Sequence, residues 1–120
     1  MVASDPNCIF CKIARGEIPA KKVYEDAEVI AFHDISPVAA VHFMIVPKQH
    51  VASLYDVTDA EAPVMGRILA LAGRLAREQG ANEGFRTIIN TGRIGRQEVP
   101  HVHVHIIANA EPLGSMIRKG

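Results

Sequence analysis

The sequence lacks tryptophan, contains few aromatic residues and has no excess of charge of either sign. Thirteen basic and thirteen acidic residues cancel, so the composition gives no indication of a nucleic-acid or membrane-surface partner. No apolar run approaches the roughly 18 residues that a membrane-spanning helix needs. The first residues lack the charged and apolar regions of a secretory signal. We therefore expect a cytoplasmic protein that binds neither nucleic acid nor membranes.

No internal repeat, low-complexity tract or linker divides the 120 residues. A hydrophobic content of 48% and a charged content of 22% are typical of an ordinary globular protein. A chain of this length can bury roughly two thirds of its unfolded surface. We expect one domain over residues 1–120, in which residues 109–120 form a C-terminal tail without a clear pattern.

Cysteine is also scarce, and the only two cysteines are Cys8 and Cys11. In a reducing compartment this spacing indicates a metal site or a redox pair before a structural disulfide. The pair alone is weak evidence, because two buried free cysteines are the ordinary alternative.

One long helix is expected at about residues 59–79. Its apolar residues recur at spacings of three and four, and Gly80 is a suitable stop. Thr58 and Glu61 resemble a capping box, but Pro63 would then lie too deep in the helix. The start of the helix is therefore left open by several residues. The residues of the apolar face are Val64, Ile68, Leu71 and Leu75.

Short apolar or alternating runs predict strands on both sides of this helix. A few strands, one long helix and two further strands indicate an α+β fold with a mostly antiparallel sheet of about five strands. The expected strands are residues 22–26, 28–33, 42–47, 85–91 and 99–108, and residues 8–13 are expected to form a short N-terminal helix.

Histidine is concentrated in the last expected strand. Because side chains alternate along a strand, His101, His103 and His105 would share one face, about 7 Å apart in succession. A lone histidine more often has a structural role, but three in a row serve no packing purpose. The competing functional interpretation is a metal site, since alternate histidines on a strand can bind zinc. A fourth histidine, His50, follows the run Pro-Lys-Gln.

The run from His101 to Ile107 resembles the His-φ-His-φ-His-φ-φ motif of the histidine-triad (HIT) superfamily, where φ is an apolar residue. The sequence is most similar to the nucleotide-binding-protein branch of that family, the Hint type. The resemblance covers nearly the whole chain, because five motifs occur in the family's order. They are Cys8-Ile-Phe-Cys-Lys-Ile, Glu17-Ile-Pro-Ala-Lys, Phe32-His-Asp-Ile-Ser-Pro37, His42-Phe-Met-Ile-Val-Pro-Lys and the triad itself.

The resemblance implies a purine nucleoside phosphoramidate hydrolase that forms a covalent nucleotidyl-histidine. His103 would attack the α-phosphorus, and water would then hydrolyse the intermediate. The carbonyl of His101 would hold the correct tautomer of His103, and His105 would hydrogen-bond the phosphate oxygens. The alternatives are a dinucleoside-polyphosphate hydrolase and a nucleotide-binding regulatory module with slow turnover. Transferase relatives carry glutamine in place of the third histidine, so His105 favours water as the final acceptor.

The resemblance also assigns the residues that bind the nucleotide. Asp34 would bind the ribose hydroxyls, although a turn aspartate is the plain alternative. Asn90 would order the phosphate site, and Gln97 would lie beside the leaving group. An apolar slot would hold the purine, although plain core packing is the alternative role of its residues. The slot would be formed by Ile9, Phe10, Ile13, Ile18, Phe32 and Ile35.

By the same resemblance, Cys8, Cys11, His50 and His101 would bind one structural zinc ion per chain. Two thiolates and two imidazoles suit a closed tetrahedral zinc site. The metal would brace the N-terminus against the catalytic strand and take no part in the chemistry.

The resemblance further implies a homodimer. The apolar character of both faces of Phe85-Arg-Thr-Ile-Ile, and the small Gly66 and Gly73 on the helix, fit close packing against a two-fold related partner.

Three features depart from the family pattern. Arg96 stands where a small residue is usual before Gln97, and Ala108-Asn-Ala follows the triad in place of Gly-Gly-Arg. The tail also lacks the tryptophan that some relatives place near the partner subunit's site. Arg96 could reach the phosphate or narrow the pocket. The other two departures leave the substrate preference and the geometry of the tail open, not the core chemistry.

Overall fold

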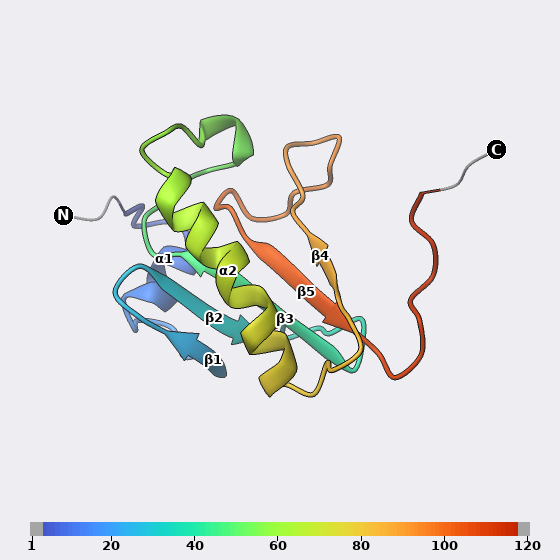
Figure 1. Cartoon of the computed structure of the whole chain (residues 1–120). Coiled ribbons are helices and arrows are strands. Elements are labelled where there is room, and N and C mark those ends of the chain that lie inside the picture. The colour runs from blue at the N-terminus through green and yellow to red at the C-terminus, as the bar shows by residue number, and fades with distance from the viewer. Residues whose placement is uncertain (1–3, 118–120) are drawn as a thin grey trace.

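A computed structural model describes residues 4–117. It has an α+β fold in which one antiparallel sheet of five strands follows the order β1-β2-β3-β5-β4 (Figure 1). One main helix and one short helix accompany the sheet, which confirms the expected fold class. The strands are β1 (Lys22–Glu25), β2 (Val29–His33), β3 (Val41–Pro47), β4 (Arg86–Ile88) and β5 (Val104–Ala108), and the helices are α1 (Ile9–Ala14), the 3-10 turn η1 (Leu54–Asp56) and α2 (Ala62–Glu78).

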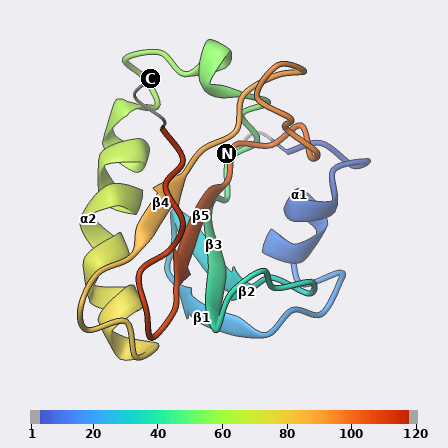
Figure 2. The same cartoon turned by 90° about the vertical axis from the view of Figure 1, so that its right-hand side faces the viewer.

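The two α-helices cover opposite faces of the sheet (Figure 2). Strand β2 shows how the alternation of side chains divides the core. Val29 and Ala31 pack with the buried face of α2, whereas Ile30 and Phe32 pack with α1. The fold therefore has a large core under α2 and a smaller one under α1, and the functional residues lie on the α1 side.

Helix α2 begins three residues later than its earliest expected start. The Glu61 carboxylate accepts hydrogen bonds from the N–H and the hydroxyl of Thr58, at 2.8 and 2.9 Å, and so closes a turn ahead of the helix. Pro63 then lies in the first helical turn, where N–H groups have no acceptor within the helix, so the missing N–H of proline removes no hydrogen bond. Gly80 follows the last turn with a φ of 99°, a conformation that favours glycine. The helix falls short of the length and hydropathy that a membrane crossing requires, as does every other described helix.

The last strand is shorter than expected, because β5 begins at Val104 and not at residue 99. In residues 99–103 the main chain bonds elsewhere. The N–H of His101 donates to the carbonyl of Val99, and that of Val102 donates to the carbonyl of Val51. Pro100 has no N–H to offer to a neighbouring strand. Strand β4 is also shorter than the expected residues 85–91, because its pairing with β5 covers only Arg86 to Ile88.

Candidate active site and metal site

His103 lies in the irregular segment that leads into β5, and its ring is buried. Its Nδ1 is 2.7 Å from the main-chain carbonyl oxygen of His101. A carbonyl can only accept a hydrogen bond, so the proton of the neutral imidazole is on Nδ1. Nε2 therefore carries a lone pair, which is the form that a histidine nucleophile requires.

The imidazoles of the triad remain on one side of the sheet, as expected, although only His105 lies in a regular strand. The ring of Phe10 in α1 contacts the rings of His101 and His103 edge-on, with centroids 5.8 and 5.1 Å apart. The centroids of His103 and His105 are 4.9 Å apart. The side chains of His103 and His105 thus converge, whereas His101 turns toward the cysteines.

His105 is paired with a histidine to which the sequence gave no role. Nε2 of His42 in β3 is 2.9 Å from Nδ1 of His105, and the N–H of Val38 donates to Nδ1 of His42 at 3.1 Å. Because Nδ1 of His42 accepts a hydrogen bond, the proton of neutral His42 is on Nε2, and Nε2–H donates to His105. The proton of His105 is then on Nε2, where it is free to donate to a phosphate oxygen.

Burial lowers the pKa of His105 to about 4, and the neighbouring imidazoles of His103 and His42 contribute to the shift. His105 is therefore neutral near pH 7, in agreement with the tautomer assigned from its contacts. A buried histidine inside an apolar strand such as His42 is itself unusual. That signal could have identified His42 from the sequence.

Asp34 lies beside this histidine pair. One of its carboxylate oxygens is 3.4 Å from Nε2 of His42, and the other accepts the N–H of Ser36 at 2.8 Å. The atoms of Asp34, His42 and His105 are close enough to hold a metal ion. The N–H of Val38, however, keeps the proton of His42 on Nε2, so this nitrogen is not available as a ligand. The arrangement therefore favours a cluster that shares protons.

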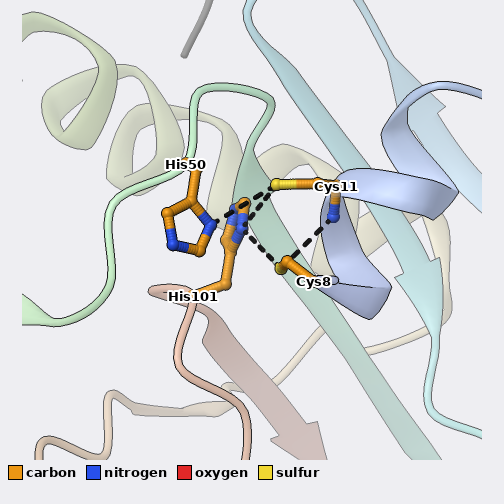
Figure 3. A group of neighbouring side chains, drawn as sticks. All are labelled: Cys8, Cys11, His50 and His101. Atoms are coloured by element: carbon orange, nitrogen blue, oxygen red, sulfur yellow. Dashed lines mark hydrogen bonds between the residues drawn. The ribbon is translucent and has the colours of Figure 1, made fainter. Parts of the chain in front are cut away.

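Four other side chains form a second cluster: Cys8 and Cys11 from the start of α1, His50 from the segment after β3, and His101 (Figure 3). Nδ1 of His101 is 3.3 Å from Sγ of Cys8 and 3.6 Å from Sγ of Cys11. Nδ1 of His50 is 3.4 Å from Sγ of Cys11. All four atoms lie within 4.8 Å of one another, so the group can hold a metal ion.

The orientation of His101 suits a metal ligand. Its Nε2 donates to the carbonyl of Pro47 at 2.8 Å, so the lone pair of Nδ1 points toward the two sulfurs. The ring is fully buried, and burial lowers its pKa to about 4, with smaller effects of His50 and His103. The imidazole is therefore neutral, as metal binding requires.

The short helix α1 brings the two cysteines together. Cys8 caps the helix, since its sulfur accepts the N–H of Cys11 at 3.4 Å. Both thiols are free and buried, and burial raises the pKa of Cys8. Two buried thiols close to two imidazole nitrogens form a donor set that fits zinc.

The residues expected to form the purine slot do not all come together. Phe10, Ile13 and Phe32 are buried in the core under α1, and Ile18 packs against that core. Ile9 is about half-exposed, and Ile35 is 98% exposed. The structure thus places four of the six residues in one cluster and the other two at the surface.

Gln97 holds the loop before the triad in place. Its amide nitrogen donates to the carbonyls of Ala52 and Val99, at 2.7 and 2.9 Å, and its amide oxygen accepts the N–H of Gly92 at 3.0 Å. Asn90 is half-buried at the start of this loop, just after β4. Arg96 is exposed and has a φ of 60°, a left-handed conformation that favours glycine over residues with a side chain.

Known proteins are similar to this chain in sequence and fold. The HIT domain family matches residues 15–111. The chain is 43% identical to the purine nucleoside phosphoramidase of Escherichia coli, over 91% of this chain and 92% of that protein. It is 46% identical to protein HitA of Neisseria gonorrhoeae, over 84% and 94%. A histidine triad protein from Clostridium difficile, 46% identical, superposes with a TM-score of 0.88 over 93% and 98% of the two chains. A HIT family hydrolase from Legionella pneumophila, also 46% identical, gives 0.82 over 85% and 92%.

The pKa of His105 predicts a pH dependence of stability. Between pH 6.5 and about 4, a histidine in the unfolded chain takes up a proton, while His105 in the folded chain does not. The contribution of His105 to the free energy of unfolding should therefore be fully present above pH 6.5. Below that pH the free energy of unfolding should fall, by up to about 1.4 kcal/mol per pH unit. Urea unfolding at pH 7 and pH 5 should show a smaller loss in His105→Gln than in the wild type.

His33→Gln is the matched control, since His33 lies outside the pair and should leave the wild-type dependence intact. Equal losses in the wild type and in His105→Gln would contradict the prediction.

Proposed function

Since the chain belongs to the HIT domain family, whose solved members include hydrolases, we propose that it hydrolyses the phosphorus–nitrogen bond of purine nucleoside phosphoramidates. The observation that carries the proposal is the hydrogen bond from Nδ1 of His103 to the carbonyl of His101, which leaves Nε2 as a nucleophile. The 43% identity to the purine nucleoside phosphoramidase of Escherichia coli supports this substrate class.

Two displacements at phosphorus account for the reaction. In the first, Nε2 of His103 forms a bond to the α-phosphorus, the phosphorus–nitrogen bond breaks, and the amine leaves with a proton taken from solvent. In the second, a water oxygen attacks the same phosphorus, the bond to His103 breaks and leaves the lone pair on Nε2, and the water gives up a proton to solvent. The Nε2–H of His105 would donate to a phosphate oxygen and stabilise the charge that develops there.

The nucleoside would bind on the α1 side of the sheet. Phe10, Ile13, Ile18 and Phe32 would contact the purine, with Ile9 and Ile35 at the rim. Asp34 would bind the ribose hydroxyls, and Asn90 would order the phosphate site. Because the amide of Gln97 is occupied by main-chain groups, we assign it the role of holding the loop beside the leaving group.

We further propose that Cys8, Cys11, His50 and His101 bind one zinc ion per chain. When bound, zinc would supply a structural cross-link with all four ligands from the protein, which leaves no open position for a substrate. The cross-link would join α1 to the segments after β3 and before β5.

A homodimer is part of the same proposal. β4 lies at the edge of the sheet, where its outer side can pair with another strand. On α2, Gly66, Leu69 and Gly73 form one stripe at helical spacing, in which Leu69 is 54% exposed and the glycines have open space beside them. An exposed leucine between two glycines suits close packing of a second helix around a two-fold axis.

Replacement of the nucleophile gives the direct test of the activity. His103→Ala should lower the turnover of an adenosine phosphoramidate by several orders of magnitude, because the covalent route is lost. Calorimetry should still detect AMP binding, and mass spectrometry of quenched wild-type reactions should detect one nucleotidyl group per chain that the variant lacks. His33→Gln should turn over like the wild type. Turnover retained in His103→Ala would exclude the covalent mechanism.

Metal content tests the zinc proposal. Protein never exposed to a chelator should contain about one zinc ion per chain. Cys8→Ser should lose the metal and unfold at a lower temperature, because metal binding contributes to folding. Lys12→Gln, on the same helix, should retain both. Wild-type protein purified without a bound metal would refute the site.

The mass in solution tests the dimer. Light scattering at micromolar concentration should give about twice the chain mass of 13.0 kDa. Leu69→Glu, which places a charge in the proposed contact, should shift the mass toward that of one chain, whereas Arg77→Glu, exposed near the end of the same helix, should not. A wild-type mass near 13.0 kDa would overturn the proposal.

A further inference from the structure

His101 belongs to two sites at once. Its ring faces the sulfurs of Cys8 and Cys11, and its main-chain carbonyl accepts the hydrogen bond from Nδ1 of His103. The position of the carbonyl sets where the nucleophile points and on which nitrogen its proton lies. A shift of His101 that moves its main chain therefore also moves the acceptor of the His103 hydrogen bond.

The sheet does not fix this carbonyl. Because β5 begins at Val104, residues 99–103 lie outside the strand pairing. Three described contacts hold the segment instead. The amide of Gln97 donates to the carbonyl of Val99 at its start, the ring of His101 donates to the carbonyl of Pro47, and the N–H of Val102 donates to the carbonyl of Val51. Val51 directly follows His50, whose ring packs edge-on against that of His101 with centroids 5.1 Å apart. The two contacts that flank the carbonyl of His101 thus involve the metal cluster: one is made by the ring of His101 itself, and the other is made to the residue after His50.

The helix that carries the cysteines also contacts the nucleophile directly. Phe10 stands between Cys8 and Cys11 in α1, and its ring contacts both His101 and His103. A cross-link between the cysteines and the two histidines would therefore hold two neighbours of the His103 ring, the carbonyl of His101 and the ring of Phe10.

We propose that Cys8, Cys11, His50 and His101 act as positioning residues for His103: with metal bound they fix the carbonyl of His101, and so determine the rate of nucleotidyl transfer more than the affinity for nucleotide. This inference rests on the proposed function. It goes beyond a structural brace, because a brace alone would change stability and leave the transfer step intact in folded protein. Misplacement of reacting groups by about 1 Å can cost a hundredfold in rate.

The test compares zinc-loaded, chelator-stripped and zinc-reloaded wild-type protein, at a temperature where circular dichroism finds all three folded. We expect nucleotidyl-His103 formation in a single turnover of adenosine phosphoramidate to slow by on the order of ten- to a hundredfold without metal. The Kd for AMP should change by less than about threefold. Reloading should restore the rate. Equal rates in the folded metal-free and loaded proteins would overturn the proposal.

His50→Ala provides a second route to the metal-poor state that leaves His101 and both cysteines in place, and it should slow the same step. Ile68→Val, which trims the core under α2 far from the cluster, is the control for lost stability and should keep the wild-type rate. If the stripped protein unfolds, His50→Ala decides the question. A wild-type rate in folded, metal-free His50→Ala would count against positioning.

A readout that does not depend on activity is hydrogen exchange of the Nδ1 proton of His103, assigned by its absence in His103→Ala. It should exchange faster in metal-free protein, because the carbonyl that accepts it is no longer fixed. If zinc-loaded protein forms no nucleotidyl-histidine, the proposed function fails. The exchange measurement then still decides whether the metal positions His103, and equal exchange with and without metal refutes it.

Discussion

The hydrogen bond between Nδ1 of His103 and the carbonyl of His101 is the constraint on which the rest of the site depends. An imidazole has two nitrogens of nearly equal basicity, and only one arrangement of its proton leaves the outward nitrogen reactive. A main-chain carbonyl is a suitable partner, because it cannot donate and cannot be protonated near neutral pH. The short irregular segment before β5 therefore has a chemical reason, since it frees a carbonyl that a longer strand would direct into the sheet.

Main-chain groups determine the tautomers of the other imidazoles as well. The carbonyl of Pro47 directs the lone pair of His101 toward the cysteines, and the N–H of Val38 directs the proton of His42 toward His105. The two groups have opposite effects. The carbonyl of Pro47 leaves a lone pair on the nitrogen of His101 that faces the cysteines, whereas the N–H of Val38 leaves a proton on the nitrogen of His42 that faces Asp34 and His105. The two clusters each contain a pair of histidines and yet are suited to different chemistry, one to metal binding and one to proton sharing.

The histidine row, the cysteine pair and the long helix were visible in the sequence because they depend on side-chain pattern. The α+β class and the antiparallel sheet followed from the order of the expected elements. The shortened β5 and the role of His42 did not, since both depend on partners distant in the chain: the carbonyl of Val51 for the N–H of Val102, and the side chain of His105 for His42. Pro47, for example, lies 54 residues from the histidine that it orients. Likewise, Ile35 is apolar like the other expected slot residues, and only the fold shows that it lies at the surface.

The loop between β4 and the triad tolerates substitution at some positions and not at others. A side chain at Gly95 would collide with the main chain of Thr91, at distances of 2.5 to 2.7 Å, and the amide of Gln97 already bridges three main-chain groups. Arg93 and Ile94, in contrast, are exposed. Mutations can therefore accumulate at these outward positions without moving the backbone that leads to the histidines, so the outer surface of the loop can diverge while the catalytic segment is inherited unchanged.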